Sequence, residues 1–170
     1  MAVKLQKMET KQEQEHNPVE DIKFALPDDL PQVVAFGYKS FDDNGLKGYG
    51  TEPSFNKTVL NVQDWMVNHA VLVKRNEDND KLIDGVIALQ TTDTWWSEDA
   101  ILYVTLFYIP PEKRTFSLAV NLLKAAQEYA IMLNIPLYID LVGNFETKRK
   151  AKLFKYAGFE EFGTSFVFTP

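Results

Sequence analysis

The stretch from Ile109 to Ala119 has the residue types of an anion-binding junction between a strand and a helix. Because proline cannot donate a hydrogen bond to a β-ladder, we expect strand pairing to stop at Pro110 and Pro111. The N–H groups of the following turn and of the first helical residues then lack partners and converge at the positive end of the helix dipole. Such a set of donors suits a pyrophosphate. Arg114 adds positive charge to it, and Ser117 adds a hydroxyl donor.

Three apolar segments position this junction. Ala100–Ile109 is apolar on both faces, as expected of a strand that is covered on each side. Ser117–Asn134 carries an apolar stripe at helical spacing, and Pro136–Val142 is typical of a second buried strand. Two strands joined by a crossover helix run parallel. We therefore predict that these strands are parallel and splay apart at their C-terminal ends.

The other segments predict antiparallel strands and three more helices. Asp28 can cap one helix, with Pro31 in its tolerant first turn, and Ser54 can cap a second. The remaining predicted elements are strands at Ile22–Leu26, Ala70–Lys74, Leu82–Gln90 and Phe159–Thr169, and a basic helix at Glu146–Ala157 that ends at Gly158. The expected class is α+β, built on a mixed α/β sheet.

The length and composition are those of one globular domain with a polar N-terminal tail. A chain of 170 residues fits a single core, and 45% hydrophobic residues are enough to build it. We assign residues 1–20 to the tail and 21–170 to the domain. The tail is either mobile or an arm that docks on a partner subunit, so a homodimer is one of the alternatives.

Composition also excludes several classes of function. The absence of cysteine rules out thiolate metal sites and a cysteine nucleophile, and His16 and His69 are too far apart in sequence to form a ligand pair, so no metal is expected. The net charge of −6 argues against binding to nucleic acid and favours cationic ligands such as amines. No apolar run approaches the roughly 18 residues that cross a bilayer, and the N-terminus lacks a signal peptide. We expect a cytoplasmic protein without membrane contact.

The junction resembles the signature of the GNAT superfamily of N-acetyltransferases, V-x-P-x-x-R/Q-x-x-G-x-G/A. Its positions are held here by Ile109, Pro111, Arg114, Ser117 and Ala119, with serine in place of the first glycine. The segment Phe154–Phe159 resembles the Y-x-x-x-G-F motif on the last helix of that family. The order of the elements supports the resemblance from about Ile22 to the C-terminus. It implies a central mixed sheet of about six to seven strands flanked by about four helices.

The resemblance also implies a cofactor, acetyl-CoA, and the residues that bind it. Family members hold the coenzyme A pyrophosphate on the loop and helix that here comprise Arg114, Thr115, Phe116, Ser117, Leu118 and Ala119. They lay pantetheine along the preceding strand, which implies backbone contacts from Phe107, Tyr108 and Ile109. Asn144 follows the second strand, near where the family often has an asparagine that touches pantetheine; alternatively, it is a turn residue after Gly143.

The implied reaction transfers acetyl to a primary amine, either of a small molecule or of a peptide. The catalytic candidates are Tyr156, Tyr103 and Asp99, with Glu98 and Thr105 as alternatives near the central strand. Phe154 stands where many members have the tyrosine that protonates the departing thiolate, and Tyr156 lies about 200° away around an ideal helix. This departure leaves a second hypothesis open, a non-catalytic module of the same fold that binds coenzyme A or a partner protein.

Overall fold

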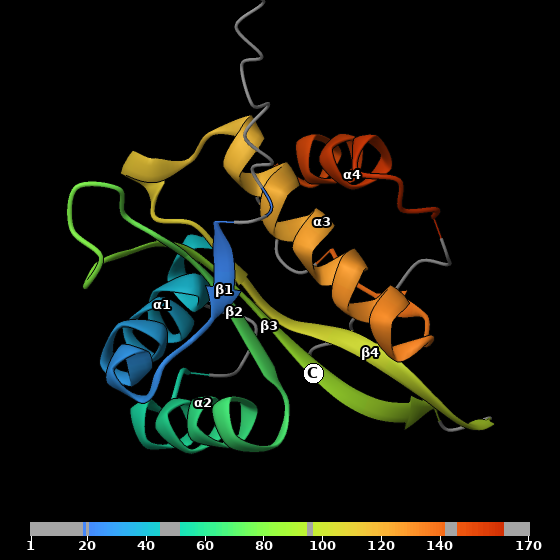
Figure 1. Ribbon diagram of the computed structural model, residues 1–170, viewed down its shortest axis with the longest axis horizontal. Helices are drawn as coiled ribbons and strands as arrows, with labels where there is room; N and C mark the ends of the chain where they lie inside the picture. Colours follow the sequence, from blue (N-terminus) through green and yellow to red (C-terminus); the bar gives the residue numbers. More distant parts are fainter. Residues whose placement is uncertain (1–18, 20, 45–51, 95–96, 142–145, 162–170) are drawn as a thin grey trace, which may run out of the picture.

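The computed structural model describes residues 19, 21–44, 52–94, 97–141 and 146–161 (Figure 1). The predicted tail apart from Val19, Asn144 and most of the predicted closing strands lie outside these residues. The described elements are β1 (Ile22–Phe24), α1 (Leu30–Asp43), α2 (Phe55–Asn68), β2 (Ala70–Arg75), β3 (Ile83–Thr94), β4 (Ser97–Tyr108), α3 (Phe116–Leu133), β5 (Leu137–Tyr138) and α4 (Thr147–Tyr156). Short 3₁₀ turns at Pro27–Asp29 and Pro111–Lys113 precede α1 and α3.

The strands form one mixed sheet in the order β1-β2-β3-β4-β5. The first four strands pair antiparallel, whereas β4 and β5 are parallel, as the crossover predicts. The described chain thus has five strands, fewer than the six or seven expected. Of the predicted closing segment Phe159–Thr169, residues 159–161 are described and are not in a strand.

Helix α2 begins at its expected cap, whereas the expected cap of α1, Asp28, is wrong. The N-cap residue of α1 is Asp29, which makes no side-chain cap bond because its carboxylate pairs with Arg75. The Ser54 side chain accepts a hydrogen bond from the Lys57 N–H and begins α2. Thr115 caps α3 in the same way, through the Leu118 N–H. Helix α3 ends at Asn134, which takes the left-handed conformation with φ of 57°, and Gly158 stops α4 with φ of 95°.

Helices cover both faces of the sheet (Figure 1). One apolar cluster packs α1 and α2 on Val71, Val73, Val86 and Ala88. The other packs α3 and α4 on the opposite face, where Ile87, Leu89 and Leu102 are almost fully buried. Because strand side chains alternate, β2 and β3 supply both clusters from successive residues.

A β-bulge at Thr105 changes which face the residues of β4 reach. Val104 pairs with Leu89, but Leu106 pairs with Ala88, so Thr105 is an extra residue without a partner in the register. In a regular strand, Val104 and Leu106 would face the same side. Here Val104 lies in the α3 cluster and Leu106 in the α1 cluster. The bulge therefore turns Tyr108 toward α1 and Phe107 toward α3.

Strands β4 and β5 separate soon after they meet. Their register consists of Leu102 with Leu137 and Tyr103 with Tyr138. Beyond Tyr103, β4 continues to Tyr108 on its pairing with β3, while the chain after Tyr138 leaves the sheet. The predicted strand Pro136–Val142 is thus much shorter than expected, because it departs from its neighbour. The splayed arrangement leaves the second edge of β4 open within the described part of the chain.

Gly85 on β3 permits the close approach of α3 to the sheet. A Cβ at this position would lie 2.9 Å from Leu122 Cδ1 and 3.2 Å from Ile109 Cγ1. We predict that Gly85→Ala destabilises the protein by about 1–3 kcal/mol through overpacking, measured by denaturant unfolding. Shortening the neighbour should relieve the strain, so Gly85→Ala should cost less in a Leu122→Ala background. Equal costs in the two backgrounds would show that Leu122 does not limit this site.

Candidate active site

The N-terminus of α3 presents unpaired hydrogen-bond donors at the C-terminal end of β4. The Thr115 side chain occupies the Leu118 N–H, and the Ala119 N–H bonds the Thr115 carbonyl at 3.2 Å. Within the described residues, the backbone N–H groups of Phe116 and Ser117 have no hydrogen-bond partner. Both residues are exposed, and the Ser117 hydroxyl lies 3.3 Å from that of Thr115. With the dipole of an 18-residue helix behind them, these donors can hold an anion.

The basic loop before α3 is tied to two other elements by ion pairs. Lys113 Nζ lies 3.2 Å from Asp84 Oδ1 on β3. Arg114 Nη2 lies 3.0 Å from Asp43 Oδ2 at the end of α1, and Arg114 Nε donates to the Ile109 carbonyl. These contacts fix the course of the loop between β4 and α3. Arg114 therefore reaches the site from the α1 side, where a carboxylate already partly neutralises its charge.

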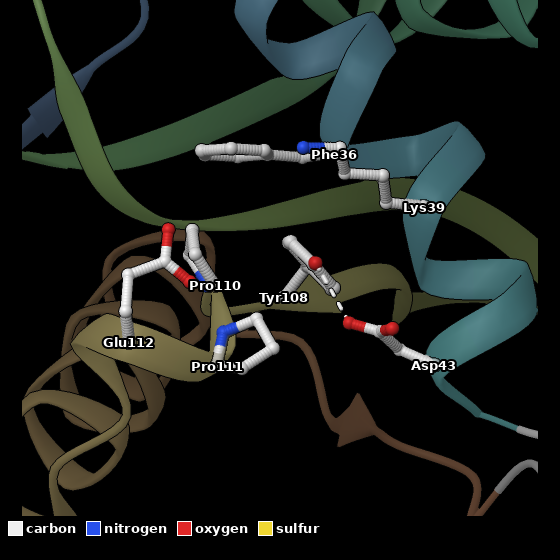
Figure 2. Close-up of a pocket in the computed structure, with 7 residues that line it drawn as sticks. All are labelled: Phe36, Lys39, Asp43, Tyr108, Pro110, Pro111 and Glu112. Carbon is white, nitrogen blue, oxygen red and sulfur yellow. Dashed lines mark hydrogen bonds between the residues drawn. The ribbon is translucent and has the colours of Figure 1, made fainter.

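Tyr108 shares the same carboxylate. Its hydroxyl donates to Asp43 Oδ2 at 2.8 Å, and the Arg114 guanidinium lies 5.9 Å from its ring centroid. Burial, and then the hydrogen bond to Asp43, raise the pKa of Tyr108 above its ordinary value. These groups line a surface pocket of about 260 Å³ between α1 and the loop. Figure 2 shows Tyr108, Asp43 and Phe36 around it. The phenol therefore stays protonated and acts as a hydrogen-bond donor.

A second cation approaches from α4. Lys150 is half-buried, and its ammonium group donates to Asn44 Oδ1 at 2.8 Å. Burial lowers the pKa of Lys150, the positive charge of Arg114 lowers it further, and Glu146 opposes the shift. Sequence reasoning missed Asp43, Asn44 and Lys150, because they lie in different elements and match no motif. The one sequence feature that could have indicated Lys150 was the basic character of the predicted helix Glu146–Ala157.

The two aromatic residues near the end of α4 lie in different environments. Phe154 is 9% exposed and packs against Phe107 of β4, with ring centroids 6.4 Å apart. Tyr156 is 70% exposed, and its ring meets that of Phe116 edge to face at 4.8 Å. Position 154 thus faces the strand beside the bulge, whereas Tyr156 lies beside the N-terminus of α3.

Tyr103 and Thr105 lie near the middle of β4, where β5 leaves the sheet. The Tyr103 hydroxyl donates to Asp140, which follows β5, and so links the two diverging segments. Burial, followed by this hydrogen bond, raises the pKa of Tyr103, so the phenol stays protonated and donates a hydrogen bond at neutral pH. The Thr105 hydroxyl donates to the Ala88 carbonyl at 3.2 Å, which ties up its proton.

Asp99 and Glu98 are exposed at the start of β4, the end opposite to the α3 junction. Asp99 Oδ2 accepts a hydrogen bond from the Ser97 hydroxyl at 3.1 Å. The structure therefore brings Phe107, Tyr108, Ile109, Arg114, residues 115–119 and Tyr156 to one end of β4, leaves Tyr103 near the middle of the strand, and places Asp99 at the other end.

Within the described ranges, no group of histidine, aspartate and glutamate side chains could hold a metal ion. In the same residues, no helix has the length and apolar character to span a bilayer.

Asp140→Asn should lower the pKa of Tyr103, because it removes the carboxylate that disfavours the charged phenolate. The pKa should stay above about 10, because burial still disfavours that form. The pH titration of ¹³C-labelled tyrosine ring signals measures this shift. Asp43→Asn is the matched control, since it should move the signal of Tyr108 and not that of Tyr103. An unchanged Tyr103 titration in Asp140→Asn would show that this hydrogen bond does not form in solution.

Comparison with known proteins identifies the fold. No protein-family model and no curated protein matches the sequence. Among solved structures, a probable acetyltransferase aligns with a TM-score of 0.67 and 15% identity, covering 86% of this chain and 95% of its own. A predicted acetyltransferase of Clostridium acetobutylicum, solved with acetyl-CoA, gives a TM-score of 0.66 and 16% identity, over 86% of this chain and 94% of its own. An aminoglycoside N-acetyltransferase in complex with CoA gives a TM-score of 0.66 and 12% identity, over 87% and 92%. The chain therefore has the fold of the GNAT acetyltransferases.

Proposed function

We propose that this protein is an N-acetyltransferase that moves the acetyl group of acetyl-CoA to a primary amine. The observation that carries the proposal is the pair of N–H groups at Phe116 and Ser117, which lack partners among the described residues and lie where β4 ends. The fold supports it, because structures with the same fold contain CoA or acetyl-CoA.

The open edge of β4 provides a path for the rest of the coenzyme. Beyond Tyr103, this strand pairs with β3 on one side only within the described residues, so its other edge has main-chain groups to offer. Pantetheine contains two amides and can extend such an edge as an added strand would. In this arrangement the pyrophosphate lies on residues 114–119, and pantetheine runs past Ile109, Tyr108 and Phe107 toward the bulge. Asn144, which lies outside the described residues, stays a candidate contact of pantetheine.

The transfer itself needs little chemistry from the protein. Acetyl-CoA supplies an acetyl group on a thioester, and an uncharged amine forms the C–N bond as the C–S bond breaks. The chain's contribution is orientation by the cradle of N–H groups, which makes the attack effectively intramolecular. Thr105 lies outside the strand register at the bulge, so its backbone N–H can polarise the thioester carbonyl. The amine proton passes to solvent, and the thiolate takes a proton from water.

The acceptor is a cationic amine before it reacts, which agrees with the net charge of −6. Tyr103 and Asp140 lie where the two strands diverge, and we assign them a role in orienting the acceptor. Their short contact and the raised pKa of Tyr103 make this pair a hydrogen-bonding unit rather than a base. Because one similar structure is an aminoglycoside N-acetyltransferase, aminoglycosides belong in the acceptor screen beside polyamines, peptide N-termini and lysine.

Coenzyme binding is the first test. Calorimetry and native mass spectrometry of the purified protein should show one acetyl-CoA per chain. Arg114→Glu should weaken binding by at least about tenfold, since it places a negative charge beside the phosphates. Lys124→Glu makes the same change of charge at an exposed position further along α3 and should have little effect. Unchanged affinity in a folded Arg114→Glu protein would remove Arg114 from the site.

The second test concerns the general acid. Tyr156→Phe should keep most of the turnover, because Tyr156 lies beside Phe116 and away from the β4 face that Phe154 contacts. A free thiol has a pKa of about 8.5, so the thiolate can leave without a general acid to protonate it. Phe154→Tyr should raise kcat, because it places a proton donor against β4.

Thiol release in an amine screen measures both effects. A loss of about a hundredfold or more in Tyr156→Phe, with coenzyme binding retained, would make Tyr156 the acid. If acetyl-CoA binds but no amine is acetylated, the non-catalytic module of the same fold is the correct function.

A further inference from the structure

Two cations at the mouth of the proposed coenzyme site are held by the last residue of α1 and by the residue that caps this helix. Asp43 accepts from Arg114 Nη2 at 3.0 Å, and Asn44, the next residue, accepts from Lys150 Nζ at 2.8 Å. Arg114 belongs to the loop before α3, and Lys150 to the first turns of α4. The end of α1 thus joins the two elements that flank the C-terminal end of β4.

The electrostatics of this cluster favour a bound anion. Lys150 is half-buried and is repelled by Arg114, so both burial and a like charge disfavour its ammonium form. Its hydrogen bond to Asn44 joins it to the residue that follows α1, and this partner is a neutral amide. Glu146 acts in the opposite direction, but its carboxylate is shared with Arg149 at 3.0 Å. Asp43 is shared in turn between Arg114 and the Tyr108 hydroxyl.

We propose that Lys150 and Arg114 together bind the pyrophosphate of the coenzyme, and that Asp43 and Asn44 occupy these two cations until it arrives. The inference rests on the proposed function, since it concerns the same site. It adds a binding residue on α4 that the sequence motif does not contain. The proposal also means that Asp43 and Asn44 compete with the coenzyme phosphates for Arg114 and Lys150.

The competition follows from charge. A pyrophosphate brings negative charge and several strong acceptor oxygens, which form charge-assisted bonds with a guanidinium and an ammonium group at once. Asp43 then lies beside an anion and repels it. When the coenzyme binds, Arg114 and Lys150 therefore leave Asp43 and Asn44 and contact the phosphates instead. The end of α1 then loses these two contacts. If the Asp43 carboxylate opposes binding, removing its charge should increase the affinity for coenzyme A.

Asp43→Asn is the decisive variant. It keeps an oxygen acceptor for the Tyr108 hydroxyl but removes the negative charge, so we expect coenzyme A to bind about tenfold more tightly, as measured by calorimetry. Asp42→Asn is the matched control, because it makes the same change at the preceding, exposed residue of α1 and should alter the affinity less than about twofold. If Asp43 only held Arg114 in place for the coenzyme, Asp43→Asn would bind more weakly, and this result would overturn the proposal.

Lys150→Gln tests the second cation. It should weaken coenzyme A binding about tenfold, whereas Lys152→Gln, with the same loss of charge on another side of α4, should change it less than about twofold. The loss in Lys150→Gln should persist with dephospho-coenzyme A, which lacks the 3′-phosphate but keeps the pyrophosphate. Disappearance of the effect with that ligand would assign Lys150 to the 3′-phosphate and overturn the pyrophosphate contact.

The outcomes separate this inference from the proposed function. A wild-type chain that binds no coenzyme A would remove the proposed function, and the inference with it. Normal binding by the wild type, with unchanged affinity in both Asp43→Asn and Lys150→Gln, would overturn the inference alone.

Discussion

The bulge at Thr105 is the constraint on which the site depends. A single extra residue in β4 reverses the alternation of the strand, so that Val104 packs under α3 while Leu106 and Tyr108 pack under α1. Without it, Tyr108 would face the α3 layer and its hydroxyl would lose its partner Asp43 at the end of α1. With it, the last residues of β4 contribute to both layers. The strand can then carry a coenzyme along one edge and still anchor α1.

The separation of β4 from β5 gives the open edge its length. Among the described residues, two pairs join these strands, and the Tyr103–Asp140 hydrogen bond spans the point at which they part. A longer parallel ladder would occupy the main-chain groups that pantetheine needs in the proposed function. The sheet therefore leaves some of its own hydrogen bonds unmade at the place where a ligand can make them.

Each of the three cations around the α3 N-terminus contacts a polar residue of another element. Lys113 and Arg114 each contact a carboxylate from another element, and Lys150 contacts the end of α1. These contacts hold the loop rigid, but they also link the anion-binding donors to the region of α1.

The sequence by itself determined the mixed sheet, the parallel β4–β5 pair, the cap of α2 and the strand–loop–helix junction. Each of these follows from local chemistry, such as apolar periodicity, a capping hydroxyl or the missing N–H of proline, acting over a few residues. Only the tertiary structure decided where Thr105 bulges, how soon β5 departs, and that Asp43, Asn44 and Lys150 meet beside Arg114. A bulge depends on how two strands pack against different helices, and the polar cluster joins residues about a hundred positions apart, Asn44 and Lys150 among them. The local sequence pattern does not predict such contacts, because they form only when elements distant in the sequence are brought together.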